Sequence, residues 1–294
     1  MTTVNRRQFT RGALTAAAAA AVSLQKLPSA FAQSTGATLT AADVIAAIKA
    51  HLKVEWNAST YRDTVKIGDP QTVVKGIASC FMDSFDVLKK AHAQGLNLVV
   101  THEPTFWTDS DLIDPIKNDP LYLEKRRFGE ANGMVVFRLH DHWHRFSPEP
   151  MVEGRESLLQ WQTDPSQPRL YRLPPTRLGD VARQVAIRLY TRSVRIVGDP
   201  DLVVTSVASG SHTLGGNITG LERADVVLAS EVREWETVEY VRDVIATGAK
   251  KGLILISHEA GEEEGMKVFA GWMRTVTPSL RSVFISTDDR LYLV

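Results

Sequence analysis

The stretch from Gly76 to Trp107, GIASCFMDSFDVLKKAHAQGLNLVVTHEPTFW, decides the fold class. It begins in an apolar run that covers residues 73–81 and continues through a helix-like segment over 84–94. It then returns to a second apolar run over 96–100, which leads into a histidine and a glutamate. Short β-branched runs that alternate with helical segments are typical of α/β proteins with buried, mainly parallel strands. We therefore predict an α/β fold.

The alternation continues along the rest of the chain. Further strand-like runs cover 134–139, 202–208, 226–229, 253–256 and 283–285, and further helix-like segments cover 178–190 and 237–247. Near the start, Thr40 and Asp43 have the spacing of a capping box that opens a helix. Near the end, residues 285–293 are predicted to form a terminal hairpin with its turn at 288–289.

The segment 147–176 differs from the alternating parts because it holds six of the thirteen prolines. Such a composition predicts a long, mostly irregular connection. We therefore expect two α/β halves with mainly parallel sheets, an N-terminal half over 33–150 and a C-terminal half over 177–294. Residues 151–176 would be the proline-rich connection between them.

The first 32 residues are expected to be an export signal rather than part of the fold. Arg6 and Arg7 precede Phe9 and an alanine-rich run that is too short for a membrane span. Ala30 and Ala32 fit a small-residue cleavage site. The segment resembles a twin-arginine signal, which predicts a soluble periplasmic protein that leaves the membrane after cleavage. The alternative is a retained N-terminal anchor helix.

Charge and cysteine content limit the classes of partner. The 294 residues include 34 basic and 34 acidic side chains, a formal net charge of zero. Binding to nucleic acid or to an anionic membrane requires a basic surface, so neither is expected. The single cysteine, Cys80, lies in an apolar run and can form no disulfide framework. A small-molecule substrate, a metal ion or another protein is the expected partner.

Six of the eight histidines lie within a few residues of the carboxyl end of a predicted strand. In open α/β sheets these ends face the ligand crevice. Imidazoles and carboxylates that meet at one edge are typical ligands of a divalent transition metal. Scattered structural or surface histidines remain the alternative. The polar groups at these strand ends are Asp83, His102, Glu103, His140, His142, His144, His212, Glu231 and His258.

Spacing within two segments refines this set. His258 and Glu262 are four apart at a predicted helix start, so both can lie on one face, and the helix N-terminus favours an ionised carboxylate. The other acidic residues there, at 259, 263 and 264, are expected to be solvated. In the HDHWH segment, residues 140–144, an extended backbone would place all three histidines on one side.

The order of these motifs resembles the Nif-three-like dinuclear metal-centre proteins, some of which are called GTP cyclohydrolase 1 type 2. The first block is the opening stretch, and the later ones are SVRIVGDPDLVVTSVASGSH, ERADVVLASEVREWETVEY and SHEAGEEEGM, all in the family's order. The resemblance covers about residues 38–294. It implies a Nif-three-like fold, a toroidal homohexamer and two divalent metal ions in a cleft.

Carried over position by position, the resemblance implies five metal ligands. The family's His-His-Pro motif falls on residues 102–104, so Glu103 replaces a histidine. Its H-x-x-x-D motif falls on 140–144, so His144 replaces an aspartate. The H-x-x-x-E motif is intact, and the Thr-Gly-Glu block retains only Glu231. The implied ligands are His102, Glu103, His144, His258 and Glu262, and the implied cofactors are two divalent ions of zinc, manganese or iron.

Three functions are compatible with this site. The first is a metal-dependent hydrolase of a small molecule, in which Glu231 or His140 orients a ligand or carries protons. The second is a non-catalytic metal-binding or metal-handling protein with the same ligands. The third is a structural ring that no longer binds metal. Because GTP is scarce outside the cytoplasm, an exported protein is not expected to be a GTP cyclohydrolase.

Overall fold

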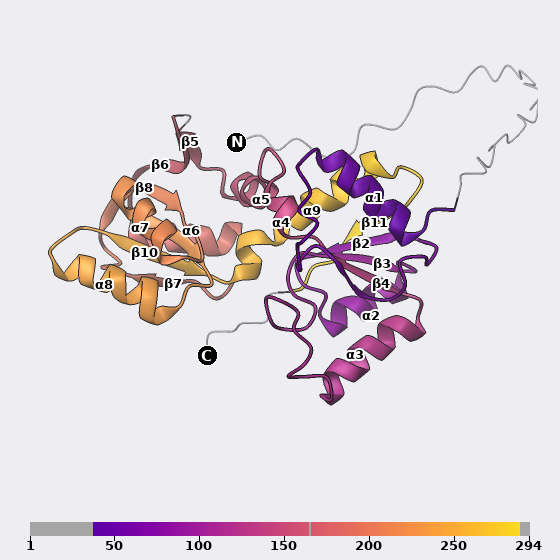
Figure 1. The fold of residues 1–294 in the computed structure, drawn as a ribbon. Coiled ribbons are helices and arrows are strands. Elements are labelled where there is room, and N and C mark those ends of the chain that lie inside the picture. The colour runs from indigo at the N-terminus through magenta and orange to yellow at the C-terminus, as the bar shows by residue number, and fades with distance from the viewer. Residues whose placement is uncertain (1–37, 165, 289–294) are drawn as a thin grey trace, which may run out of the picture. The chain divides into compact units, whose positions relative to one another are not determined.

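The computed structural model describes residues 38–164 and 166–288 as parts of one compact unit. It contains two β-sheets with helices on their faces, which confirms the α/β prediction (Figure 1). The first sheet has the strand order β1-β4-β3-β2-β11, with β1 alone antiparallel to its neighbour. Its strands are β1 (Val65–Ile67), β2 (Ile77–Cys80), β3 (Leu98–Thr101), β4 (Val135–Arg138) and β11 (Ser282–Phe284).

Helices cover both faces of the first sheet (Figure 1). One face packs against α1 (Ala41–Leu52) and α9 (His258–Val276), and the other against α2 (Phe85–Ala93) and α3 (Pro120–Ala131). The predicted capping box is present at the start of α1, where the Thr40 hydroxyl and the Asp43 carboxylate each bond the other's backbone amide. The sheet is therefore buried on both sides, as its uninterrupted apolar strands require.

The second sheet has the order β5-β6-β8-β9-β10-β7. Its central strands β8, β9 and β10 are parallel, and β5, β6 and β7 pair antiparallel at the edges. Helix α6 (Leu178–Arg188) packs on one face, and α7 (Leu214–Arg223) and α8 (Glu239–Ala246) pack on the other. The strands are β5 (Gln162–Asp164), β6 (Gln167–Arg177), β7 (Arg195–Val197), β8 (Val203–Ser209), β9 (Val226–Ser230) and β10 (Gly252–Ile256).

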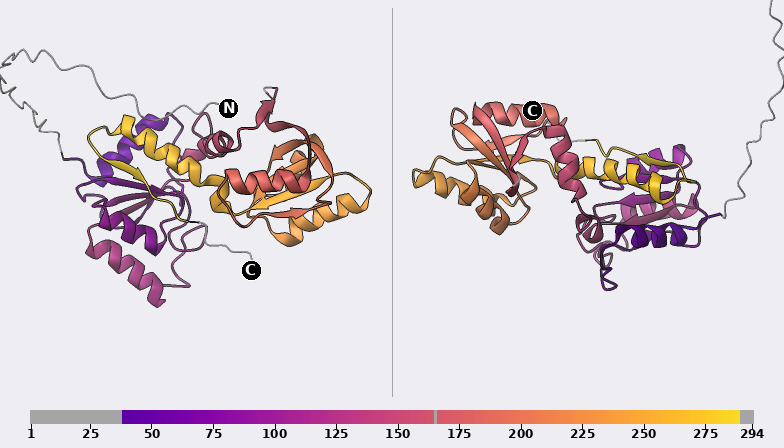
Figure 2. Two further views of the ribbon diagram at one scale, coloured as in Figure 1. Left: turned by 180° about the vertical axis from the view of Figure 1, so that it is seen from behind. Right: turned by 90° about the horizontal axis from the view of Figure 1, so that it is seen from above.

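Helix α9 joins the two sheets. It begins directly after β10 of the second sheet, and Met266, Phe269 and Met273 then pack into the core of the first sheet. Figure 2 shows α9 running along β2 and β11. Ser79 of β2 donates a hydrogen bond to the carbonyl of Met266 at 2.6 Å. The middle of α9 is thereby fixed relative to β2 of the first sheet.

The prediction of an irregular connection over 147–176 is wrong. The segment forms α5 (Pro150–Leu159) and the antiparallel pair β5 and β6. Pro150 is the first residue of α5, where a missing amide hydrogen costs nothing, and Glu149 caps the helix. The prolines at 168, 174 and 175 lie in β6, whose pairing is irregular between Arg172 and Thr176.

Two other predictions concern the chain ends. The expected hairpin over 285–293 extends beyond residue 288, so part of it lies outside the described residues. Residues 282–284 form β11, which pairs in parallel with β2. The predicted signal over 1–32 also lies outside the described residues. Within the part that the structure describes, no helix is both long and apolar enough to cross a membrane.

Candidate metal centre

The first group of site residues follows β3. His102 is fully buried, and its Nδ1 lies 3.1 Å from the carbonyl oxygen of Leu139. A carbonyl can only accept, so Nδ1 carries the proton and Nε2 presents a lone pair. Glu103 is the next residue and is also buried. The predicted pair therefore lies together at the carboxyl end of a central strand.

The HDHWH segment is not extended, so the prediction that its three histidines share one side is wrong. It forms the short helix α4 (Asp141–His144), preceded by His140. His140 and His144 are four apart and face the same way, and their ring centroids are 4.8 Å apart. Each has Nδ1 against a carboxylate, Asp141 at 3.0 Å for His140 and Glu149 at 2.9 Å for His144.

His142 points away from the other two histidines. Its Nδ1 contacts the carboxylate of Asp63, and its Nε2 accepts a hydrogen bond from the backbone amide of Asn57 at 2.8 Å. Its ring stacks on Trp56 with the centroids 3.7 Å apart. Both ring nitrogens are thus satisfied, and His142 is a buried structural residue.

Asp63 fixes α4. Its carboxylate accepts hydrogen bonds from the backbone amides of His140, Asp141 and His142 at 2.6, 3.1 and 2.9 Å. Together with the contact to the His142 ring, one buried side chain satisfies the whole N-terminus of the turn that carries His140 and His144.

We expect Asp63→Ala to lower the free energy of unfolding by about 3 to 5 kcal/mol, because it leaves a buried imidazole and several amides without an acceptor. Urea unfolding followed by circular dichroism measures this. Asp69→Ala is the matched control, because Asp69 is exposed and accepts one local amide bond, and a loss of about 1 kcal/mol or less is expected. Equal losses for the two variants would contradict the role assigned to Asp63.

The second group of site residues lies at the start of α9. Ser257 caps the helix by accepting a hydrogen bond from the amide of Ala260, and His258 and Glu262 lie on one face. Nδ1 of His258 contacts the carboxylate of Glu231, which follows β9 in a left-handed backbone conformation with φ of 46°. A non-glycine residue in that conformation is uncommon and concentrates at functional sites. Glu231 therefore orients His258.

His212 joins this group, although the sequence singled it out only as one strand-end histidine and not as a ligand. Its Nδ1 lies 2.7 Å from the carbonyl oxygen of Ser230, so Nε2 again presents a lone pair. That Nε2 is 3.3 Å from Oε1 of Glu262. The sequence signal for His212 as a ligand is its position after β8. This strand is the parallel neighbour of β9, and parallel neighbours end at the same edge of a sheet.

The five histidines at the site share one arrangement. Each holds Nδ1 against an oxygen acceptor and turns Nε2 toward its neighbours and toward Glu103 and Glu262. The separations are 3.2 Å from His102 Nε2 to His144 Nε2, 3.3 Å from His102 Nε2 to Glu262 Oε2, 3.0 Å from His258 Nε2 to Glu262 Oε2, and 3.5 Å from His258 Nε2 to Glu103 Oε1.

These separations fit shared coordination of a cation. Ligand atoms about 2.1 Å from one ion lie about 3.0 to 3.4 Å apart at octahedral or tetrahedral angles. Lone pairs that face each other at 3.2 Å, as in His102 and His144, repel unless a proton or a cation lies between them. Oε1 of Glu103 is buried without a hydrogen bond and lies 3.7 Å from His140 Nε2 and 3.8 Å from His102 Nε2. The donor set therefore fits a divalent metal.

The electrostatics of the site favour a positive charge. Burial alone would raise the pKa of Glu262, but its contacts with the Nε2 atoms of His102, His212 and His258, when these carry a proton in place of a cation, hold it well below its usual range. Burial opposes protonation of His258, yet its hydrogen bonds to Glu231 and Glu262 raise its pKa to about 10. Burial and the neighbouring imidazoles lower the pKa of His140 to about 3, so its ring is neutral near pH 7.

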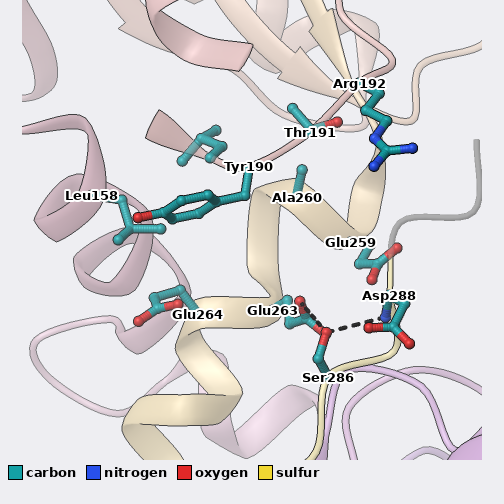
Figure 3. A pocket seen from close by; sticks show the side chains of 11 residues that line it. Leu158, Tyr190, Thr191, Arg192, Glu259, Ala260, Glu263, Glu264, Ser286 and Asp288 are labelled. Atoms are coloured by element: carbon teal, nitrogen blue, oxygen red, sulfur yellow. Dashed lines mark hydrogen bonds between the residues drawn. The ribbon is translucent and has the colours of Figure 1, made fainter. Parts of the chain in front are cut away.

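The opposite face of the α9 start is not simply solvated, as the sequence had suggested. Glu259, Glu263 and Glu264 are all half-buried and line a separate pocket of about 470 Å³ (Figure 3). Glu263 accepts hydrogen bonds from the backbone amide of Thr287 at 2.6 Å and from the hydroxyl of Ser286 at 3.2 Å. This face of α9 therefore holds the chain that follows β11, while the other face serves the histidine cluster.

A cleft of about 1060 Å³ opens over the histidine cluster. Both of its arginines are already paired, Arg62 with Asp109 and Asp141, and Arg233 with Glu236. Apolar and aromatic side chains line other parts of it, namely Phe81, Met82, Pro104, Trp107, Leu214 and Val232. The cleft can admit a small molecule to the cluster.

Solved structures share this fold. A Bacillus cereus protein related to NIF3 has a TM-score of 0.68 at 12% identity, with 87% of this chain and 99% of that chain covered. The Staphylococcus aureus hypothetical protein SA1388 has a TM-score of 0.66 at 15% identity over 87% of this chain and all of that chain. The protein ybgI, of unknown function, has a TM-score of 0.66 at 18% identity, with 86% of this chain and 100% of that chain covered. No protein-family model and no curated protein matches the sequence.

The expected Nif-three-like fold is therefore confirmed. The five implied ligands and the two implied helper residues, Glu231 and His140, lie together in one cluster, and three groups of residues within it could hold a metal ion. These groups are His102, His140 and His144; His212, His258 and Glu262; and His102, Glu103 and Glu262.

Proposed function

We propose that this chain is a Nif-three-like protein that binds two divalent metal ions and hydrolyses a small molecule. The observation that carries the proposal is the shared orientation of five imidazoles, each with Nδ1 on an acceptor and Nε2 directed into one cluster. Histidines that bind metals have this arrangement, because the Nδ1 partner fixes both the tautomer and the ring. Five side chains in one tautomeric state are not needed for packing alone.

The ligands divide around Glu262. One ion would be held by His102, His144 and Glu103, and the other by His258 and His212. Glu262 lies between the two groups, because Oε2 faces His102 of the first group and His258 of the second, while Oε1 faces His212 of the second. Mixed imidazole and carboxylate donors suit zinc, manganese or iron.

Such ions, when bound, act as Lewis acids and lower the pKa of water toward neutrality. The chain's own residues would orient the ligands and move protons. Glu231 holds His258 through Nδ1 and is itself exposed at the cleft, so it could pass protons between His258 and a reactant there. His140 is neutral near pH 7 and lines the same cleft.

The cleft supports a small-molecule substrate over a nucleotide. Free arginine or lysine side chains usually bind triphosphates, and both cleft arginines already pair with carboxylates. Periplasmic export through a twin-arginine signal, in which the protein crosses the membrane already folded, is part of the same proposal. So is assembly into a homohexamer, as the family resemblance implies.

The second candidate function is metal handling without catalysis. It is supported by the use of four of the five imidazoles as ligands, because a hydrolase would then have to rely on His140 or on the carboxylate of Glu231 for proton transfer. Storage or transfer of an ion would need the same ligands and an open cleft, but no proton carrier.

The test combines metal binding and turnover in His258→Ala. We expect wild-type protein loaded with zinc, manganese or iron to hydrolyse at least one substrate in a panel of phosphoesters, amides and cyclic amidines. His258→Ala should lose about 100-fold or more in metal affinity, because one ligand contributes roughly a quarter of the binding free energy. His51→Ala is the control, because His51 lies exposed on α1.

Three outcomes separate the candidates. Activity that falls with metal content in His258→Ala supports the hydrolase. Tight metal binding by wild type with no turnover of any substrate supports metal handling. Failure of wild-type protein to bind any of the three metals in calorimetry would refute both.

A further inference from the structure

Arg138 is a fully buried arginine beneath the cluster. It is the last residue of β4 and pairs in register with Thr101, immediately before His102. Its Nε donates a hydrogen bond to the carbonyl of His102 at 3.1 Å. Its Nη1 donates to the carbonyl of Asp109 and lies 3.4 Å from a carboxylate oxygen of Asp111. The guanidinium is thus held rigidly below the strand-end residues.

The same guanidinium approaches Glu103. Nη2 of Arg138 donates to Oδ1 of Asp109 at 3.4 Å and lies 3.6 Å from Oε2 of Glu103. The other oxygen, Oε1, is buried, makes no hydrogen bond, and faces the Nε2 atoms of His102, His140 and His258 at 3.5 to 3.8 Å. The two oxygens of one carboxylate therefore have different environments, one beside a fixed cation and one among imidazole lone pairs.

We propose that Arg138 is the positioning residue that makes Glu103 a one-oxygen metal ligand. The proposal rests on the metal binding proposed above. The charge of Arg138 attracts Oε2 of Glu103. Oε1 of Glu103 is then the one oxygen of this carboxylate that is free to bind the metal ion. It also compensates the charge of a buried carboxylate, which costs much free energy when unpaired. Arginine suits this role because its planar fork serves a carboxylate and a backbone carbonyl together.

The role follows from the charge at position 103. A neutral side chain there would need no cation below it, whereas a buried glutamate does. If Arg138 acts through the carboxylate of Glu103, its effect on metal binding depends on that carboxylate. If Arg138 only holds the loop after β3, its effect is independent of the side chain at 103.

A double-mutant cycle distinguishes these roles. Zinc and manganese affinities are measured by titration calorimetry for wild type, Arg138→Met, Glu103→Gln and the double variant. We expect Arg138→Met to lower affinity by about 10- to 100-fold in the wild-type background, as for other groups that orient ligands. In the Glu103→Gln background, we expect Arg138→Met to change affinity by less than about 3-fold, because the charge that it orients is gone.

Folding is checked by far-UV circular dichroism and thermal unfolding of all four proteins. If Arg138→Met does not fold, Arg138→Lys, which retains the charge without the fork, takes its place in the same cycle with the same expectation. Equal losses of affinity in both backgrounds would overturn the proposal while leaving the metal site intact. Absence of metal binding by wild type would instead refute the proposed function.

Discussion

Replacing Glu262 with alanine is expected to reduce affinity for each of the two proposed metal ions by about 100-fold or more. Glu262 belongs to two of the three candidate groups, with one oxygen toward His102 and His258 and the other toward His212. Its loss would remove a ligand from each ion and leave the imidazoles without a shared carboxylate. Titration calorimetry and metal content after dialysis measure the effect.

Glu264→Ala provides the matched control for this variant. Glu264 lies on the same helix two residues later, outside the cluster, and pairs with Lys267 at 2.7 Å. We expect it to retain both ions and the wild-type melting temperature within about 2 °C, since such pairs contribute little. If Glu262→Ala retained two tightly bound ions per chain, the assignment of Glu262 as a ligand in both candidate groups would be wrong.

Removal of bound metal is expected to lower the melting temperature by roughly 10 °C. A ligand at about 1,000 times its dissociation constant stabilises a protein by about 4 kcal/mol, and each kcal/mol corresponds to about 2 to 4 °C for a chain of this size. The physical cause is the repulsion among lone pairs and carboxylates that a cation relieves, most directly between His102 and His144. Differential scanning calorimetry before and after chelation measures the change.

The stabilisation should return when zinc or manganese is added to the chelated protein. It should be absent in Glu262→Ala, whose melting temperature is expected to be insensitive to chelation. A wild-type melting temperature that chelator and added metal leave unchanged would contradict a site that binds metal in the folded state.

Much of the site follows from local sequence features. An apolar strand that ends in a polar residue places that residue at the ligand edge of a parallel sheet, so His102, Glu103, Glu231 and His258 could be predicted. The helical spacing of four placed Glu262 beside His258, and the capped start of α9 confirms that geometry. These inferences needed only the period of a strand and the period of a helix.

Features set by contacts between distant parts of the chain could not be predicted in this way. The HDHWH segment is helical because Asp63, about 80 positions earlier, satisfies its first amides, and no local pattern reveals that partner. The role of Arg138 likewise depends on its burial beneath Glu103, although a charged residue in an apolar strand was a signal that could have been used.

The proline-rich segment shows the same limit. A high proline content predicts irregular structure, but Pro150 starts α5, where proline is favourable. Three further prolines lie in β6, in or beside a part of the strand where the pairing is irregular. Position within an element, rather than the number of prolines, decides whether they break it.

Metal content per chain tests the central claim most directly. We expect elemental analysis of the wild-type protein, purified without chelators from its native compartment, to find about two equivalents of divalent zinc, manganese or iron per chain. The same measurement on Glu262→Ala should find less than about half an equivalent. Wild-type protein without bound transition metal, or a Glu262→Ala variant with an undiminished content, would contradict the assignment of this histidine and glutamate cluster as a metal centre.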